Sequence, residues 1–496
     1  MKFDFVVVGG GSAGVVTAYR LAEQNLGTVA LIEAGPNDKN IEKVLELRRW
    51  PELLESELDY DYAIEPQQNG NSAMRHSRAK VLGGCSSHNS CIAFQAPDYD
   101  FENWASLGVE GWDVATVRAS YNKMLSKVNL EASDSNNACG KAMIEAANTY
   151  GIPEVKFPQG HYEEGAGWFQ LNKKGGTRHS SSVAYLHHSE QVPENLTVLC
   201  DTKVSQIVLD EERVVQAIET NQGRIEIGKE LVVSTGAIDT PKLLMLSGIG
   251  PKKHLEEIGI SVKVDLPGVG ENLIDHPEGV IVWEASQSVP KETAQEYEIG
   301  LFCKVEQEAP IADLMFHFGT VAFDMHTVPN GYPTSENAFS LTPNVMRAKS
   351  QGTIRLRSAN PADAPLVDPK YFTDAEGYDQ KIMVEGIKVA RKLMEQPAMK
   401  AWVKRELAPG AEVQTDEEIF EYIKKTHNTV YHPAGTCKMG NPEEELTVVD
   451  SALKVKGVKG LRVADASVFP AMVSTNPNLT CMMIGERCAE LIGEEY

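Results

Sequence analysis

The N-terminal stretch carries the clearest pattern of apolar and polar positions in the chain. An unbroken apolar run at residues 5–8 is typical of a buried parallel strand. Helical spacing follows, with Ala18, Leu21 and Ala22 on one face, and a second apolar run covers residues 28–32. The pattern predicts a strand, a helix and a second strand in succession, the unit from which parallel α/β sheets are built.

Four glycines lie between the first predicted strand and the helix, and three of them form a motif. Gly9, Gly11 and Gly14 have the G-x-G-x-x-G spacing, and Glu33 follows the second strand. In dinucleotide-binding folds such glycines permit a tight turn, the approach of a pyrophosphate to the helix N-terminus and close packing of helix on strand. The acidic residue accepts hydrogen bonds from a ribose. We therefore expect a Rossmann-like dinucleotide-binding unit; the alternative is a glycine-rich turn in some other α/β protein.

The rest of the chain mixes helical and strand periods. Helical spacing predicts helices over residues 45–54, 112–130, 141–150, 378–395, 416–425 and 482–492, and one more that ends at residue 246. Apolar runs and alternation predict strands over residues 230–234, 311–320, 353–358 and 460–465, and a β-meander over residues 196–209 and 214–226. Residues 60–77 and 173–182 show little periodicity and are expected to be loops.

The last predicted strand resembles the N-terminal unit, because it too ends in an acidic residue, Asp465. We therefore expect an α/β fold with a Rossmann-like nucleotide-binding domain that is discontinuous in sequence and closed by the C terminus. This domain is expected to comprise residues 1–150, 191–277 and 430–496. A second domain, with a mainly antiparallel sheet and covering helices, is expected to comprise residues 151–190 and 278–429.

Composition limits the classes of partner. The 496 residues suffice for two or three domains with a large core, and 42% hydrophobic and 24% charged residues are ordinary for a globular protein. The formal net charge of −23 makes nucleic acid and anionic membrane surfaces poor partners. An acidic surface can concentrate a cationic substrate, although it more often serves solubility.

The cysteines and the N terminus bear on the cellular compartment. Eight cysteines form no C-x-x-C pair and no zinc-ligand spacing, so we expect free thiols and no metal site. The first predicted strand begins almost at Met1, which leaves no room for a leader peptide, and no apolar run is long enough to span a bilayer. We expect a cytoplasmic protein without membrane contact.

Four blocks of the chain form a set. They are the N-terminal glycine unit, the turn at residues 83–90, residues 236–250, and C-terminal segments at 426–435 and 476–489. Together they resemble the glucose–methanol–choline (GMC) oxidoreductases, which are flavin enzymes, and residues 236–250 match the family's second signature in full. The likeness extends over essentially the whole chain. It implies a Rossmann-like FAD-binding domain and a substrate domain.

Within the family, the chain most resembles members that oxidise choline with oxygen. The resemblance implies a homodimer with FAD as cofactor, which oxidises choline through betaine aldehyde to glycine betaine and reduces O2 to H2O2. A dehydrogenase of the family that uses a different electron acceptor, an FAD-carrying lyase and a flavin-binding protein without catalysis are the alternatives, because a fold alone does not settle function.

The resemblance assigns catalytic roles to four residues. His432 matches the family's active-site histidine, which either exchanges a proton or, when charged, holds an alkoxide. Asn476 matches its partner position, where an amide can hydrogen-bond the substrate oxygen. Ser90 matches a hydroxyl that faces the substrate, and His317 matches a second pocket histidine. Taken singly, such residues more often serve in loops, caps or the core.

Cofactor contacts are implied for the turn and the C-terminal strand, in addition to the N-terminal glycines and Glu33. The residues concerned are Gly84, Ser87, His88, Asn89 and Asp465. His88 matches the position through which some members of the family bind FAD covalently, whereas many others carry an apolar residue there. The resemblance therefore implies a histidyl-linked flavin.

A cation-binding pocket is implied by five further residues. A trimethylammonium group offers no hydrogen-bond donor, so its pocket needs aromatic faces and a carboxylate. The resemblance places Glu278 as the carboxylate, Trp50, Tyr297 and Tyr431 as aromatic faces and Val430 as a small apolar residue near the flavin. Tyr297 departs from the tryptophan expected there. Each aromatic residue, taken alone, is equally typical of core packing.

Overall fold

The N-terminal apolar run forms the centre of a seven-stranded sheet in the described chain. The structure is a computed structural model that describes residues 1–133, 135–157, 163–187 and 192–496. β1 (Lys2–Val8) pairs in parallel with β2 (Val29–Ile32) and β13 (Ile225–Val233). Outside them lie β10 (Leu196–Leu199), β25 (Leu461–Val463), β12 (Val215–Thr220) and β11 (Val204–Leu209).

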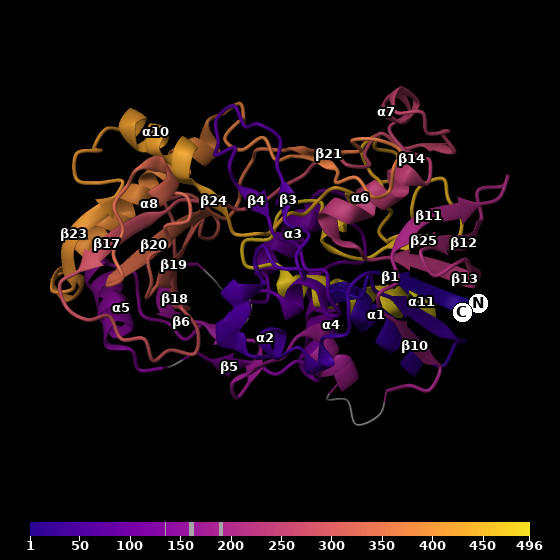
Figure 1. Ribbon diagram of the computed structural model, residues 1–496, viewed down its shortest axis with the longest axis horizontal. Coiled ribbons are helices and arrows are strands. Elements are labelled where there is room, and N and C mark those ends of the chain that lie inside the picture. The colour runs from indigo at the N-terminus through magenta and orange to yellow at the C-terminus, as the bar shows by residue number, and fades with distance from the viewer. Residues whose placement is uncertain (134, 158–162, 188–191) are drawn as a thin grey trace.

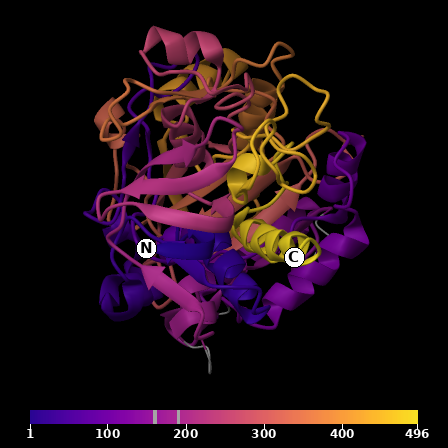
Figure 2. The same cartoon turned by 90° about the vertical axis from the view of Figure 1, so that its right-hand side faces the viewer.

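The C-terminal strand and helix complete this part of the molecule. α1 (Ser12–Glu23) packs on the sheet and on α11 (Asn478–Gly493), and β25 pairs in parallel with β13. The ring of Tyr496 contacts that of Phe5, with centroids 5.3 Å apart, so both chain ends lie at the same end of the molecule (Figures 1 and 2). The strand order β10-β2-β1-β13-β25 is Rossmann-like, which confirms the predicted fold.

A second sheet lies at the opposite end of the molecule (Figure 1), and all its pairings are antiparallel, as predicted. The order of its main strands in the described chain is β23 (Val403–Ala408), β17 (Ile281–Ala285), β20 (Ala338–Val345), β19 (Leu314–Gly319), β18 (Tyr297–Cys303) and β6 (Gly165–Trp168). The short strands β16 (Pro277–Glu278) and β24 (Asn428–Thr429) extend it. α8 (Tyr378–Met394) packs on β20, and α10 (Asp416–Thr426) packs on α8.

Shorter elements connect and cover the two sheets. α5 (Ala138–Tyr150) packs on β6 and β18, although the expected boundary at residue 150 groups it with the other sheet. The expected boundary at residues 190–191 touches positions outside the described residues. The other helices are α2 (Glu42–Leu45), α3 (Asp98–Ser106), α4 (Val114–Leu125), α6 (Gly236–Leu246), α7 (Lys252–Glu257) and α9 (Pro397–Lys400). The paired short strands are β3 (Tyr62–Ala63) with β4 (Arg75–His76), β5 (Glu131–Ala132) with β7 (Gln170–Leu171), β8 (Lys173–Lys174) with β9 (Thr177–Arg178), β14 (Ile249–Gly250) with β15 (Val264–Asp265) and β21 (Thr353–Arg355) with β22 (Leu366–Asp368).

No helix in the described ranges combines the length and the apolar character that crossing a membrane requires. Three predicted elements fold differently. The expected loop at residues 173–182 contains β8 and β9, which pair with each other. The helix expected over residues 45–54 is instead the end of α2 and a 3-10 helix over Leu47–Leu53, because Glu46 is extended and Pro51 lacks an N–H. The expected loop at residues 60–77 contains β3 and β4, and Tyr62, Met74 and His76 within it are buried.

The predicted meander is correct only in part. β11, β12 and β13 are antiparallel neighbours, but residues 196–199 form β10, which pairs in parallel with β2 at the opposite edge of the sheet. Alternation of apolar and polar residues predicts a strand without identifying its partner.

Candidate active site

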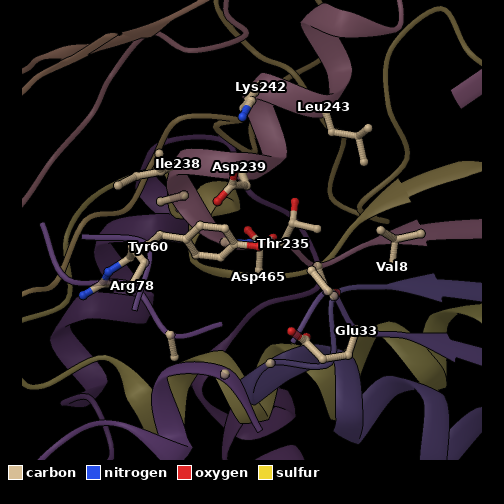
Figure 3. A pocket seen from close by; sticks show the side chains of 18 of the residues that line it. Val8, Glu33, Tyr60, Arg78, Thr235, Ile238, Asp239, Lys242, Leu243 and Asp465 are labelled. Atoms are coloured by element: carbon tan, nitrogen blue, oxygen red, sulfur yellow. Dashed lines mark hydrogen bonds between the residues drawn. The ribbon is translucent and has the colours of Figure 1, made fainter. Parts of the chain in front are cut away.

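The glycine-rich loop between β1 and α1 lines a cavity, and Figure 3 shows other residues that line it. Gly9 has φ = +102°, and a Cβ atom there would lie 2.3 Å from the carbonyl oxygen of Ser234. A Cβ atom at Gly14 would lie 1.9 Å from the Gly9 carbonyl oxygen, so only glycine permits this turn and this packing. Gly11 is the N-cap of α1; because it has no side chain, it leaves the first N–H groups of the helix for an anionic ligand.

Glu33 lines the same cavity, next to the glycine loop (Figure 3). Its carboxylate accepts hydrogen bonds from the backbone N–H groups of Gly10 (2.9 Å) and Gly35 (2.8 Å). Burial raises the pKa of this carboxyl to about 7. The two backbone bonds fix the side chain at the position where the sequence predicts a ribose contact; that contact stays a prediction.

Asp465 lies across the cavity, where β25 ends (Figure 3). It accepts hydrogen bonds from the N–H of Gly236 (2.8 Å), the hydroxyl of Thr240 (2.6 Å) and the N–H of Ser467 (2.7 Å). Burial raises its pKa. Asp465 thus joins the C-terminal strand to the start of α6, and its role as a cofactor ligand stays a prediction.

A second cavity adjoins the first. Six residues line both: Ser12, Arg78, Cys85, Pro433, Ala466 and Cys481. The two cavities are therefore adjoining parts of one space; Glu33 lines the first part and Glu278 lines the second. Glycine backbone, a helix N-terminus and an acidic residue at one end are the donor and acceptor set that suits a dinucleotide.

The turn at residues 83–90 lies where the two cavities meet. Gly83 and Gly84 have φ values of +87° and +53°, and a Cβ atom at Gly84 would lie 2.5 Å from the Cα of Gly11. The turn therefore contacts the glycine loop directly. His88, Asn89 and Ser90 line the second cavity, and Gly84 lines the first.

Buried polar side chains fix this turn by hydrogen bonds. The Arg178 guanidinium donates to the carbonyl oxygen of Ser86 (3.2 Å) and to the Oδ1 of Asn89 (2.9 Å), and its burial lowers its pKa. The Ser87 hydroxyl donates to Asp38 at 3.1 Å, and Ser87 lines neither cavity. The geometry gives Ser87 a part in holding the turn; its predicted cofactor contact is not tested.

His88 presents one nitrogen to the protein. Its Nε2 lies 3.0 Å from the carbonyl oxygen of Leu53, and because a carbonyl only accepts, Nε2 carries the hydrogen. Burial is the main cause that lowers the pKa of His88 to about 4, so the ring is neutral at neutral pH. Nδ1 is then the nitrogen with a lone pair.

His432 is oriented by a second, buried histidine. The Nε2 of His276 lies 3.0 Å and 3.1 Å from the carbonyl oxygens of Met346 and Val473, so it carries a hydrogen. Burial lowers the pKa of His276 to about 4, which leaves its Nδ1 as an acceptor. The Nδ1 of His432, 2.9 Å away, therefore donates to it, and Nε2 of His432 keeps a lone pair on a ring that lines the second cavity. Burial also holds the pKa of His432 well below its usual range.

Asp275 fixes the backbone of the same segment. This buried carboxylate accepts hydrogen bonds from the N–H of His432 (3.0 Å) and from the hydroxyls of Thr429 and Tyr371, each at 2.5 Å. Sequence reasoning gave no role to Asp275 or His276. Both residues stand in the Asp-His-Pro-Glu-Gly run that contains the predicted site residue Glu278, and this position could have drawn attention to them. Their hydrogen-bond partners in the structure are what identify their roles.

Two further predicted residues have unused hydrogen-bonding atoms. Asn476 lines the second cavity, and its Oδ1 has no partner among the described residues. The Nδ1 of His317 accepts from the amide of Asn344 (3.0 Å), so in the neutral ring Nε2 carries the hydrogen; it too lacks a partner within the described ranges. The Oδ1 of Asn476 can accept a hydrogen bond from a ligand, and the Nε2–H of His317 can donate one to a ligand oxygen.

The predicted cation-binding residues line the same cavity. They are Glu278, Trp50, Tyr297, Tyr431 and Val430. The rings of Trp50 and Tyr297 have centroids 6.3 Å apart, and Phe323, which was not predicted, packs edge-on against Tyr297 at 6.2 Å. Glu278 is 6% exposed and lies 3.7 Å from the Nδ1 of His317. A buried carboxylate among aromatic faces suits a cation that carries no hydrogen-bond donor.

Comparison with known proteins decides the family. The N-terminal profile of the GMC oxidoreductases matches residues 3–278, and their C-terminal profile matches residues 348–485. The chain is a GMC oxidoreductase. The family predicted from the sequence is therefore confirmed.

Relatives of this GMC oxidoreductase match it over almost the whole chain. It is 52% identical to choline oxidase from Arthrobacter globiformis, over 99% of this chain and 94% of the relative. It is 33% identical to mitochondrial choline dehydrogenase from Mus musculus, over 99% and 89% of the two chains. Among solved structures, pyridoxine 4-oxidase from Mesorbium loti superposes with a TM-score of 0.91 and 26% identity, covering 98% of each chain.

Proposed function

We propose that this GMC oxidoreductase is an FAD-dependent choline oxidase. It oxidises choline through betaine aldehyde to glycine betaine and reduces O2 to H2O2. The observation that carries the proposal is the second cavity, where His432 and Asn476 share one space with the buried Glu278 and the rings of Trp50 and Tyr297. The 52% identity to a choline oxidase supports the choice of substrate and of oxygen as acceptor.

The space that the two adjoining cavities form together fits FAD. The loop at Gly9 and Gly11 and the N-terminus of α1 would bind its pyrophosphate, and Glu33 its ribose. His88 would carry the covalent link to FAD. Because its Nε2–H donates to the Leu53 carbonyl, Nδ1 is the nitrogen whose lone pair could form that link. When bound, FAD supplies hydride acceptance from the alcohol and electron transfer to O2.

The residues of the chain itself handle the proton and the oxygen of the substrate. The lone pair on Nε2 of His432 accepts the proton of the choline hydroxyl. The Nε2–H of His317 donates to the substrate oxygen, and so does an N–H of the Asn476 amide, which lines the same cavity together with Ser90. These groups stabilise the charge that develops on that oxygen.

The carboxylate and the aromatic rings of this cavity bind the trimethylammonium group. Glu278 supplies a negative charge, and Trp50, Tyr297 and Tyr431 supply π faces. Val430 keeps the region beside His432 apolar. Tyr297 offers a smaller face than tryptophan, which leaves room for a bulkier cationic alcohol.

Two measurements on one purified sample test the proposal. Choline added without oxygen should bleach the flavin absorption, and air should restore it with release of H2O2. Bleaching that persists in air would instead indicate a dehydrogenase with another acceptor, and no bleaching would indicate a lyase. Acid precipitation tests the His88 link, since a covalent flavin stays with the polypeptide and His88→Asn should release it.

The wider organisation is part of the same proposal. We divide the chain into the FAD-binding and substrate domains at the boundaries expected from the sequence; the packing of α5 on the second sheet favours moving the first boundary from residue 150 to a point before residue 138. We also propose a cytoplasmic homodimer that serves glycine betaine synthesis. Light scattering on the purified protein tests the dimer.

A further inference from the structure

One wall of the cation site is tied to a carboxylate outside the cavity. The indole N–H of Trp50 donates to Oε2 of Glu296 at 3.1 Å. Trp50 lines the second cavity, whereas Glu296 is half-buried and is not among the residues that line it in the described chain. Glu296 directly precedes Tyr297. One short segment therefore supplies the aromatic face of Tyr297 and a carboxylate bonded to a second aromatic residue, Trp50.

The charge of Glu296 also acts on a second aromatic residue of the cation-binding pocket, Tyr297. Burial is the largest cause that raises the pKa of Tyr297, and the charges of Glu278 and Glu296 follow as the next two. The charges of two carboxylates therefore act on the Tyr297 ring: Glu278, which lines the cavity, and Glu296, which does not. Sequence reasoning found only Glu278, because Glu296 belongs to no motif.

A carboxylate that accepts from an indole N–H changes the properties of the ring. Hydrogen bonds to ionised acceptors are shorter and stronger than neutral ones, and they draw the N–H hydrogen toward the anion. The indole then holds more electron density on its face, which is the part of the ring that attracts a cation. An uncharged group of the same shape gains nothing from this effect.

We propose that Glu296 is a specificity-determining residue that acts through Trp50. It favours a quaternary ammonium group over an uncharged tert-butyl group of the same shape. The inference rests on the proposed oxidation of choline and adds to it a residue that contacts neither the substrate nor the reacting atoms.

The first test removes the charge but keeps the hydrogen bond. Glu296→Gln retains an amide oxygen that accepts from the Trp50 N–H. We expect KM for choline to rise about three- to tenfold, with kcat unchanged, while KM for the uncharged tert-butyl analogue of choline changes less than about twofold. Glu292→Gln is the matched control, because Glu292 is exposed on the same stretch and its loss removes the same net charge. It should leave both KM values unchanged.

The second test asks whether the effect passes through the indole N–H. In a Trp50→Phe background an aromatic ring stays but the donor is lost, so Glu296→Gln should raise KM for choline by less than half as much as it does in the wild type. Binding of tetramethylammonium measured by calorimetry gives a readout without turnover, and its Kd should rise by the same factor as KM.

The outcomes separate this inference from the proposed function. If the wild type does not oxidise choline, the proposed function is wrong. If it does, but Glu296→Gln raises KM for both alcohols equally, or has an undiminished effect in the Trp50→Phe background, only the role of Glu296 is overturned.

Discussion

At the scale of single residues, buried groups outside the cavity determine which nitrogen of His432 carries its hydrogen. Two main-chain carbonyls fix the hydrogen on Nε2 of His276, and the remaining nitrogen of His276 fixes the hydrogen on Nδ1 of His432. The lone pair at the cavity follows from this sequence of bonds. Orientation of a histidine by a partner on its other nitrogen is a common device for setting its tautomer.

Replacing His276 should therefore impair catalysis more than binding. His276→Leu fills a similar volume but cannot accept from Nδ1 of His432, so His432 loses the preference for the tautomer with a lone pair at Nε2. We expect kcat for choline to fall at least about tenfold, with little change in the Kd of tetramethylammonium. His276→Asn offers an amide oxygen as acceptor and should retain more activity. Equal losses in the two variants would show that His276 serves packing alone.

Motifs predicted residues that face the cavities and missed those that support them. His432, Asn476 and Glu278 stand in runs that match the family, and the structure brings all three to one cavity. The role of His276 depends on three partners from distant parts of the chain, and that of Glu296 on one. No spacing in the sequence encodes such contacts.

At the scale of elements, two glycine turns meet at the centre of the molecule. The Gly84 backbone lies against Gly11, and this contact sets the junction of the two cavities. The sequence predicted both turns and a close approach to a ligand. It did not predict that the turns touch each other.

Gly84→Ala should weaken cofactor binding. The added Cβ would meet the Cα of Gly11 at 2.5 Å and force the turn away from the glycine loop. We expect the ratio of FAD to protein in the purified variant, measured by absorbance, to fall by at least about half. Gly331→Ala is the matched control: Gly331 also has a positive φ, +87°, but no atom of the described residues lies within 4 Å of its Cβ position. Equal FAD loss in both variants would assign the effect to backbone strain rather than to the contact.

A buried carboxyl anchors the loop that carries Asn476. Asp100, on α3, accepts from the N–H (2.7 Å) and the hydroxyl (2.9 Å) of Ser474, two residues before Asn476. Burial raises the pKa of Asp100 to about 7 in the folded protein, whereas the pKa of an aspartate in the unfolded chain is about 4. Folding therefore favours the protonated form, and the stability that this form contributes is lost as pH rises from about 4 to about 7.

Asp100→Asn should remove this pH dependence. Its Oδ1 accepts from the Ser474 N–H and its amide donates to the Ser474 hydroxyl, so the anchor stays without a titrating group. Between pH values of about 4.5 and 7.5, the thermal midpoint of the variant minus that of the wild type should rise by at least about 1 °C. A constant difference over this range would contradict the raised pKa.

The errors at the element scale have two physical origins, one long-range and one local. Strand and helix periods follow from local geometry, and they predicted β1, α1, β2, α8 and α11. Pairing is a long-range property, so β10 was joined to the wrong neighbour. The 3-10 helix at Leu47–Leu53 reflects a proline inside a helical pattern.

At the scale of the whole molecule, segments that pack with both sheets contribute residues to one cavity. The C-terminal segment that leads into α11 brings Asn476, and the turn next to the glycine loop brings His88 and Ser90. The second sheet brings Glu278 on β16, Tyr297 on β18 and His317 on β19. Sequence predicted both sheets, but their mutual placement, and hence the cavity, required the structure.

The net charge of −23 acts on the molecule as a whole and should assist the capture of a cation. Potentials summed over an acidic surface raise the association rate of oppositely charged ligands, and salt screens them over a Debye length of about 10 Å at about 0.1 M. Raising the ionic strength from about 10 mM to about 0.5 M should lower kcat/KM for choline by at least about twofold. The uncharged tert-butyl analogue is the control and should show no such change.

This long-range effect is separable from the local one at Glu296. Removing one charge of a large excess leaves the surface potential nearly intact, so Glu296→Gln should lower kcat/KM for choline at every salt concentration while keeping the wild-type salt dependence. A variant whose salt dependence disappears would place the attraction at Glu296 itself. A wild type whose two substrates respond equally to salt would show that the acidic surface serves solubility, the alternative that composition left open.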